Sequence, residues 1–178
     1  MNSADLRVVK TQQAISAAFF AELAITPFDQ ITVTSLTRRA LIGKATFYNH
    51  YIDKYQLATA LIEKAVDALR PMLGQAVQPT PHPVTPLPTD LLHQLRLLAT
   101  IHAPEADFET ISRWRTAHYY QTRLVAQTPA LQHPATVARY LAAAAIAILT
   151  TYLADSTATD QAVLLAGLQE LVHLTTQA

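Results

Sequence analysis

Residues 31–54 read ITVTSLTRRALIGKATFYNHYIDK, and this stretch predicts two short helices joined by a tight turn. Thr32 is a suitable N-cap for the first helix, which should end near Leu41. Gly43 interrupts the helical pattern, and residues 44–51 resume it after a turn of three or four residues. The order of helix, turn and helix predicts a helix-turn-helix.

The second of these helices has an apolar side and a polar side. At 100° per residue, Phe47 and Tyr51 share one side and should pack inward. The outward face and its flanks then hold Ala45, Thr46, Tyr48 and Asn49. Asn can pair with adenine, Ala and the Thr methyl can touch the thymine methyl, and Tyr, His and Lys can bind phosphate. We therefore expect this helix to enter a DNA major groove, with a helical hairpin that has no DNA role as the alternative.

The rest of the chain predicts further helices. Only three glycines are present, and apolar residues follow helical spacing rather than strand-like alternation. Expected helices outside the motif cover residues 7–24, 54–77, 90–102, 104–127, 134–155 and 159–176. Residues 79–90, PTPHPVTPLPTD, hold five prolines and should form a connector, or alternatively a proline-rich docking segment. The predicted fold is all-α, with an N-terminal three-helix unit that contains the helix-turn-helix and a C-terminal helical bundle.

Composition excludes several kinds of site. The chain has 178 residues, 51% of them hydrophobic, which is enough for a sizeable core. Without cysteine, it has no disulfide, thiolate metal site or cysteine nucleophile. The formal net charge is zero, and residues 1–54 carry six Lys or Arg against four Asp or Glu. Because no strong overall field attracts nucleic acid, DNA binding must depend on local arrangement.

No segment predicts a membrane span or a secretory signal. The longest apolar run, residues 140–152, is shorter than the ~20 residues that a span needs. The first residues, MNSADLRVVK, lack the apolar centre of a signal peptide. We therefore expect a soluble, cytoplasmic protein with no membrane partner.

Enzyme and metal chemistry find little support. Glu170 and His173 have the Glu-x-x-His spacing of di-iron carboxylate sites, but the chain has no second such pair. It also lacks a glycine-rich phosphate loop and a recognisable Ser/His/Asp motif. We expect no catalytic residues, no metal and no cofactor.

Polar aromatic residues gather between residues 113 and 120, which read RWRTAHYY. One interpretation is that Trp114 and one tyrosine pack in the core while the arginines extend to solvent. The other is an effector pocket, because such pockets combine apolar walls with a few polar groups. Trp114, His118 and Tyr119 are the expected effector-binding residues.

The last two predicted helices carry more apolar surface than a single small domain requires. Pairing them with a second copy of the chain would bury this surface in a four-helix interface. The expected dimer contacts include Ile148, Leu164, Leu168 and Leu171. The alternative is that both helices are internal to one protomer.

The stretch TVTSLTRRALIGKATFYNHYIDKYQL, residues 32–57, resembles the DNA-binding region of the tetracycline-repressor family of bacterial transcription regulators. The resemblance extends over residues 10–57, with Leu41 and Gly43 as departures from the commonest pattern. It implies a dimer whose recognition helices, residues 44–51, enter successive major grooves of DNA. It also implies an effector-binding C-terminal domain and phosphate contacts from Thr34, Tyr48, His50 and Lys54.

These observations lead to one main hypothesis and one alternative. The main hypothesis is a ligand-responsive homodimeric repressor that binds a near-palindromic operator on double-stranded DNA and an unknown small-molecule effector. Residues 1–54 would bind DNA, and residues 55–178 would sense and dimerise. The expected DNA contacts are Thr34, Lys44, Ala45, Thr46, Tyr48, Asn49, His50 and Lys54. The alternative is a helical protein-interaction adaptor on the same scaffold that does not read DNA.

Overall fold

The computed structural model describes residues 3–76, 87–127, 131–154, 166, 167 and 170. This part of the chain is helical apart from one hairpin with two strands of two residues each, so the predicted all-α fold class is confirmed. The N-terminal elements are α1 (Ser3–Leu23), the short 3-10 helix η1 (Phe28–Gln30), α2 (Val33–Arg39) and α3 (Lys44–Tyr48). The elements that follow are α4 (Lys54–Ala68), α5 (Arg70–Ala76), α6 (Thr89–Leu98), β1 (His102–Ala103), β2 (Ala106–Asp107), α7 (Phe108–Gln127) and α8 (Pro134–Ala154).

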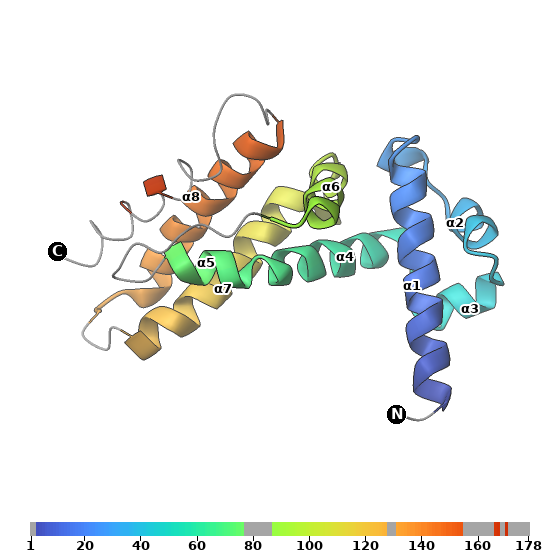
Figure 1. Ribbon diagram of the computed structural model, residues 1–178, viewed down its shortest axis with the longest axis horizontal. Coiled ribbons are helices and arrows are strands. Elements are labelled where there is room, and N and C mark those ends of the chain that lie inside the picture. Colours follow the sequence, from blue (N-terminus) through green and yellow to red (C-terminus); the bar gives the residue numbers. More distant parts are fainter. Residues whose placement is uncertain (1–2, 77–86, 128–130, 155–165, 168–169, 171–178) are drawn as a thin grey trace.

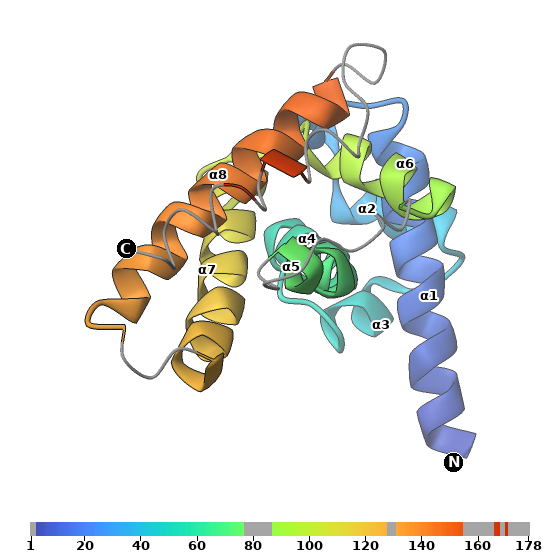
Figure 2. The same cartoon turned by 60° about the vertical axis from the view of Figure 1, so that its left-hand side comes forward.

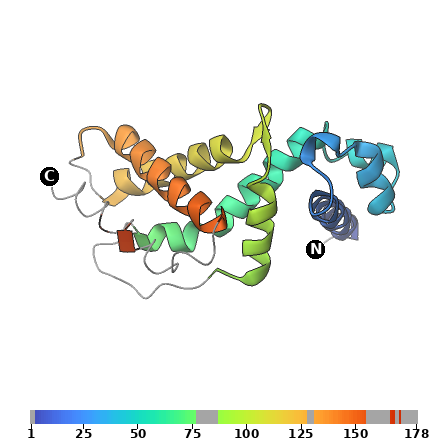
Figure 3. The ribbon, with the colours of Figure 1, turned by 90° about the horizontal axis from the view of Figure 1, so that it is seen from above.

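The elements form two groups joined by α4. Helices α1, α2 and α3 lie together at one end of the molecule, and α5, α7 and α8 lie at the other (Figure 1). Seen from above, α4 runs from the first group toward the second (Figure 3). A displacement of α4 would therefore change how the two groups are placed relative to each other.

The core of the N-terminal group is built from apolar residues that are far apart in the sequence. Phe19 of α1, Leu36 of α2 and Phe47 of α3 are all buried in it. The Phe28 ring contacts Phe19 edge to face, at 6.2 Å between centroids, and contacts Tyr55 of α4 at 5.6 Å. These aromatic contacts attach the start of α4 to the helix-turn-helix.

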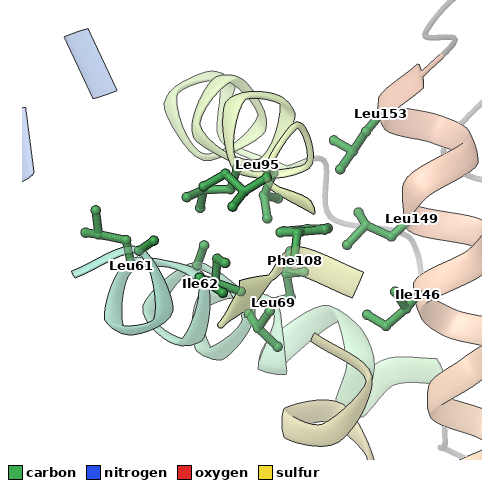
Figure 4. Close-up of a cluster of buried hydrophobic side chains, with 14 of the residues drawn as sticks. Leu61, Ile62, Leu69, Leu95, Phe108, Ile146, Leu149 and Leu153 are labelled. Atoms are coloured by element: carbon green, nitrogen blue, oxygen red, sulfur yellow. The ribbon is translucent and has the colours of Figure 1, made fainter. Parts of the chain in front are cut away.

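The second core lies where α4, α6, α7 and α8 meet (Figure 4). Ile62, Leu95 and Phe108 are completely buried there. Ile146 and Leu149 of α8 point into the same cluster (Figure 4). Because α4 contributes to both cores, the two groups are not packed independently of each other.

The single helix expected over residues 54–77 is wrong, because the chain turns between α4 and α5. Helix α4 ends with Leu69 as its C-cap, and α5 begins at Arg70. Pro71 explains the break. Proline has no N–H to continue the helical ladder, and its ring would clash with the carbonyl four residues earlier, that of Asp67.

The expected boundaries at residues 102–104 also need correction. Instead of passing directly from helix to helix, the chain forms a hairpin in which His102 pairs with Asp107 and Ala103 with Ala106. Pro104 and Glu105 make its turn, which suits the fixed φ of proline. The helix expected over residues 159–176 lies almost entirely outside the described residues.

Helix α8 is the one described helix that is long and apolar enough to cross a membrane by length and composition. It runs over 21 residues. Leu141, Ile146, Leu149 and Leu153 are nevertheless buried in the protein. Because a core helix passes the same test, we interpret α8 as a core helix.

Candidate nucleic-acid interface

Helix α2 begins with a reciprocal cap. The Ser35 amide donates to Thr32 Oγ1 at 3.1 Å, and the Thr32 amide donates to Ser35 Oγ at 3.2 Å. Two amides that have no helical partner are thereby satisfied. The prediction that Thr32 caps this helix is confirmed, and Asp53 likewise caps α4 by accepting the Gln56 amide at 2.8 Å.

The turn after α2 contains an unusual backbone conformation. Leu41 has a φ of 55°, and it is the one non-glycine residue with positive φ in the described chain. The Ile42 amide donates to the Thr37 carbonyl at 3.0 Å, and the Leu41 amide donates to the Arg38 carbonyl at 3.3 Å. This pair of bonds is the Schellman arrangement, which usually places glycine where Leu41 stands.

Helix α3 is shorter than the predicted span of residues 44–51. It covers Lys44–Tyr48, Asn49 is its C-cap, and the Tyr51 amide still donates to the Phe47 carbonyl at 2.9 Å. Phe47 is completely buried, and its ring contacts Tyr51 at 5.8 Å between centroids. As the sequence predicts, Phe47 and Tyr51 anchor the inward side of this segment.

Most of the expected DNA contacts lie on the accessible surface of α2 and α3. The exposed residues of this set are Thr34, Lys44, Ala45, Tyr48 and Asn49, and the partly exposed ones are Thr46 and His50. Tyr48 has 54% of its surface exposed although it follows the buried Phe47. The outward face of α3 is therefore free to meet a partner, and contact with DNA stays a prediction.

Lys54 does not fit the phosphate contact expected of it. Its ammonium donates to three backbone carbonyls, at 2.9 Å to Phe28, 2.8 Å to Asp29 and 2.9 Å to Ile31. The same group lies 4.8 Å from the centre of the Phe28 ring, and burial lowers the pKa of Lys54. All three donors are used where carbonyls converge at the end of η1, so Lys54 joins η1 to α4 instead of facing solvent.

The two arginines of α2 differ in their surroundings. Arg39 Nε lies 2.5 Å from Glu22 Oε1, which ties α2 to α1. Arg38 is exposed, as expected for a solvated charge. A phosphate contact from Arg39 would require this ion pair to open.

Sequence reasoning missed a groove beside the motif. It lies between the first turns of α1 and the turn that joins α2 to α3, and its volume is about 410 Å³. It is lined by Leu6, Arg7, Lys10, Thr11, Ala14 and Ile42. The spacing of Arg7 and Lys10, three residues apart on one helix, could have indicated this basic face.

The three expected effector-binding residues do not form one site. Trp114 is 61% exposed, and its ring stacks on the exposed His118 at 6.1 Å between centroids. Tyr119 instead donates from its hydroxyl to the Arg70 carbonyl at 3.1 Å, which attaches α7 to α5. The three residues therefore do not line one pocket in the described structure, and effector binding by them stays a prediction. The alternative, with Trp114 and one tyrosine in the core, is wrong for the exposed Trp114 but holds for one tyrosine, because Tyr120 is buried.

Helix α7 buries a different stripe, which sequence reasoning also missed. Ser112, Thr116 and Tyr120 follow one another at four-residue intervals and are all buried. Their hydroxyl oxygens, together with Nε of Arg123, have no hydrogen-bond partner in the part of the chain described. Burial raises the pKa of Tyr120, so its phenol stays neutral. Buried polar groups are usually paired, so this stripe is unusual.

Arg115 does not supply a free positive charge near that stripe. Its guanidinium binds both carboxylate oxygens of Asp67, at 2.9 Å and 2.7 Å, and so links α7 to α4. The hydrogen bond from Arg115 holds the pKa of Asp67 below its usual value. Arg113 pairs with Glu109 on the exposed side of α7.

The expected dimer contacts are only partly visible. Ile148 lies on α8 and is partly buried against the core of its own protomer. Leu164, Leu168 and Leu171 lie outside the described residues. The dimer interface therefore stays a prediction.

Comparison with known proteins gives two informative similarities, although no family model matches the chain. Over 62 residues, or 34% of its length, the chain is 39% identical to the uncharacterized HTH-type transcriptional regulator YxbF of Bacillus subtilis (strain 168). That match spans only 16% of the relative. The chain also resembles the dihydroxyacetone kinase operon activator DhaS in structure, with a TM-score of 0.60, 17% identity, and coverage of 94% of this chain and 96% of that chain. The second similarity concerns the fold alone.

Proposed function

We propose that this chain is a DNA-binding transcription regulator of the tetracycline-repressor type. The observation that carries the proposal is α3, which is anchored by the buried Phe47 and presents Lys44, Tyr48 and Asn49 to solvent. Local similarity to an HTH-type transcriptional regulator supports the same function. In this proposal residues 1–54 bind DNA, and residues 55–178 sense a ligand and dimerise.

In this proposal Asn49 contacts the bases, and neighbouring residues bind the phosphate backbone of DNA. The carboxamide of asparagine matches the two hydrogen-bonding groups that adenine shows in the major groove. Tyr48, His50 and Thr34 donate to phosphates from the flanks of the same surface. Because Lys54 and Arg39 are already paired, neutral donors make a large share of these contacts.

A homodimer places two α3 helices on one duplex. Two such helices related by two-fold symmetry would read half-sites about one helical turn apart, so the operator would be nearly palindromic. Ile148→Glu on α8 should shift the protein from dimer to monomer in sedimentation. Because the half-sites would then be bound separately, the affinity for the operator should also fall.

The test is selection of bound sequences from random DNA duplexes. Enrichment of a near-palindrome would support the proposal. Asn49→Ala should then reduce affinity by ~1–3 kcal/mol and relax preference at one base pair, while Tyr48→Phe should weaken all sequences similarly. Output without enrichment at low salt would overturn DNA reading and favour the adaptor alternative.

We also propose that the hydroxyl stripe of α7 binds the effector. Ser112, Thr116 and Tyr120 have no hydrogen-bond partner among the described residues, and the same holds for Nε of the cationic Arg123, so a small molecule with hydrogen-bond acceptors suits the stripe best. Thr116→Val removes an unpaired buried hydroxyl and should stabilise the free protein by about 1 kcal/mol. Because one hydrogen bond to the ligand is lost, the same change should weaken the response to a ligand that releases DNA by up to about tenfold, and an unchanged response would move the effector site elsewhere.

Helix α4 is the element that transmits the response. Its first residue is bound to η1 of the DNA-binding part, and Asp67 near its end is bound to α7. A ligand that favours a displaced α4 would change the spacing of the two recognition helices and release DNA. Repression follows if the operator overlaps a promoter. The structural neighbour is named an activator, so a promoter reporter assayed with and without this protein decides the direction of regulation.

A further inference from the structure

The N-terminal half of α1 extends past the core of the DNA-binding part. None of the residues from Leu6 to Ala14 is buried, and the buried side of the helix begins at Ile15. At 1.5 Å per residue, this stretch projects about 13 Å. In Figure 2 the N-terminal end of α1 reaches below α3 and every other labelled helix.

This projecting stretch borders the motif on one side. The groove described above has Arg7, Lys10 and Thr11 on its α1 wall and Ile42 on its other wall. Ile42 comes just before Gly43, the N-cap of α3, so the groove ends where the recognition helix begins. Lys44 and Ala45, which follow Gly43 in the chain, are exposed and belong to the surface that the proposed function assigns to DNA.

The charge of the groove has one sign. Its lining includes two cations and no carboxylate, and neither Arg7 nor Lys10 pairs with a described acidic side chain. By contrast, Arg39 at the far side of the same unit is neutralised by Glu22. The Thr11 hydroxyl donates to the Arg7 carbonyl at 2.9 Å, so it is held against the backbone of its own helix.

We propose that Arg7 and Lys10 bind two phosphates of one DNA strand, next to the DNA major groove that α3 enters. Residues three apart on a helix are about 5–6 Å apart at Cβ, and one strand of DNA carries a phosphate every ~3.4 Å along its axis. With their Cβ atoms about 5–6 Å apart, the long side chains of Arg7 and Lys10 can reach neighbouring phosphates. This inference rests on the proposed function and extends the footprint of each protomer from the helix-turn-helix to the end of α1.

The test compares Arg7→Ala/Lys10→Ala with the wild-type full-length protein. Binding is measured on a selected operator and on a random duplex of equal length, over a series of salt concentrations. We expect the double variant to lose affinity on the order of tenfold for both duplexes, because phosphate contacts carry no sequence information. The magnitude of the log–log salt slope should fall by about two for each bound protomer.

The control is Lys64→Ala, which removes an exposed charge from α4 away from the groove. It should leave the salt slope unchanged, whereas Lys10→Ala alone should lower it by about one per protomer. A double variant with the salt slope and affinity of the wild type would overturn the inference. It would also be overturned if Lys64→Ala lowered the salt slope as much as Lys10→Ala does, because the effect would then depend on net charge alone. If the wild-type protein binds neither duplex, the proposed function is wrong, and this inference fails because it rests on that function. The wild-type measurement alone identifies this outcome.

Discussion

Replacing Leu41 by glycine should stabilise this protein. Leu41 has a φ of 55° and closes α2 through the bonds that its own amide and the Ile42 amide make to α2 carbonyls. Its side chain is 91% exposed, so it contributes almost nothing to the core. The residue therefore has the strain of a left-handed conformation without compensation from burial.

The size of the effect follows from two opposing terms. A side chain in the left-handed region costs about 1–2 kcal/mol, which Leu41→Gly removes. Glycine also has more conformational freedom in the unfolded chain, which offsets about 0.5–1 kcal/mol of that gain. A net gain of about 0.5–1 kcal/mol in the free energy of unfolding remains. For a chain of this size it corresponds to a rise in Tm of about 1–4 °C.

The assay is thermal and urea unfolding of wild type, Leu41→Gly and Leu41→Ala. The alanine variant is the matched control, because it removes the leucine side chain and keeps a Cβ in the strained conformation. We expect Leu41→Ala to stay within about 0.5 kcal/mol of wild type and Leu41→Gly to exceed both. A glycine variant no more stable than the alanine variant would refute the strain argument.

Three further predictions concern single side chains. Lys54→Met should lower the free energy of unfolding by about 1–3 kcal/mol, because three carbonyls lose their hydrogen-bond donor. If the variant instead lost DNA affinity at unchanged stability, Lys54 would have the phosphate contact first expected of it. The pKa of Asp67 is lowered from 3.8 in the folded state, so its pairing with Arg115 stabilises the protein above that pH and is lost as pH falls below it. Asp67→Asn should accordingly flatten the acid side of a stability–pH curve, and a curve like that of wild type would contradict this. Trp114→Phe should change stability by less than about 0.5 kcal/mol, and acrylamide should quench Trp114 readily, since the indole is 61% exposed; a protected indole would show that it is covered in solution.

Local features of the fold were predictable from the sequence. The cap at Thr32, the cap at Asp53 and the inward pair Phe47 and Tyr51 each depend on residues within one or two helical turns. Such features depend on hydrogen bonds and periodicity that a short segment contains in full. The break at Pro71 was predictable on the same grounds, although the apolar pattern across it concealed the break.

The side-chain partners that decide function could not be predicted in the same way. The periodicity of α7 is compatible with several rotations about its axis, and only packing against α4 and α8 buries Tyr120 and leaves Trp114 in solvent. Lys54 meets the carbonyls of residues more than twenty positions away, and this pairing arises only when η1 folds against α4.

The sequence by itself therefore determined the helical class, the helix-turn-helix and its caps, because these depend on neighbours along the chain. Among the described residues, tertiary structure decided which cations are left without an acidic partner and which buried hydroxyls are left without a hydrogen bond, because both depend on contacts between distant segments.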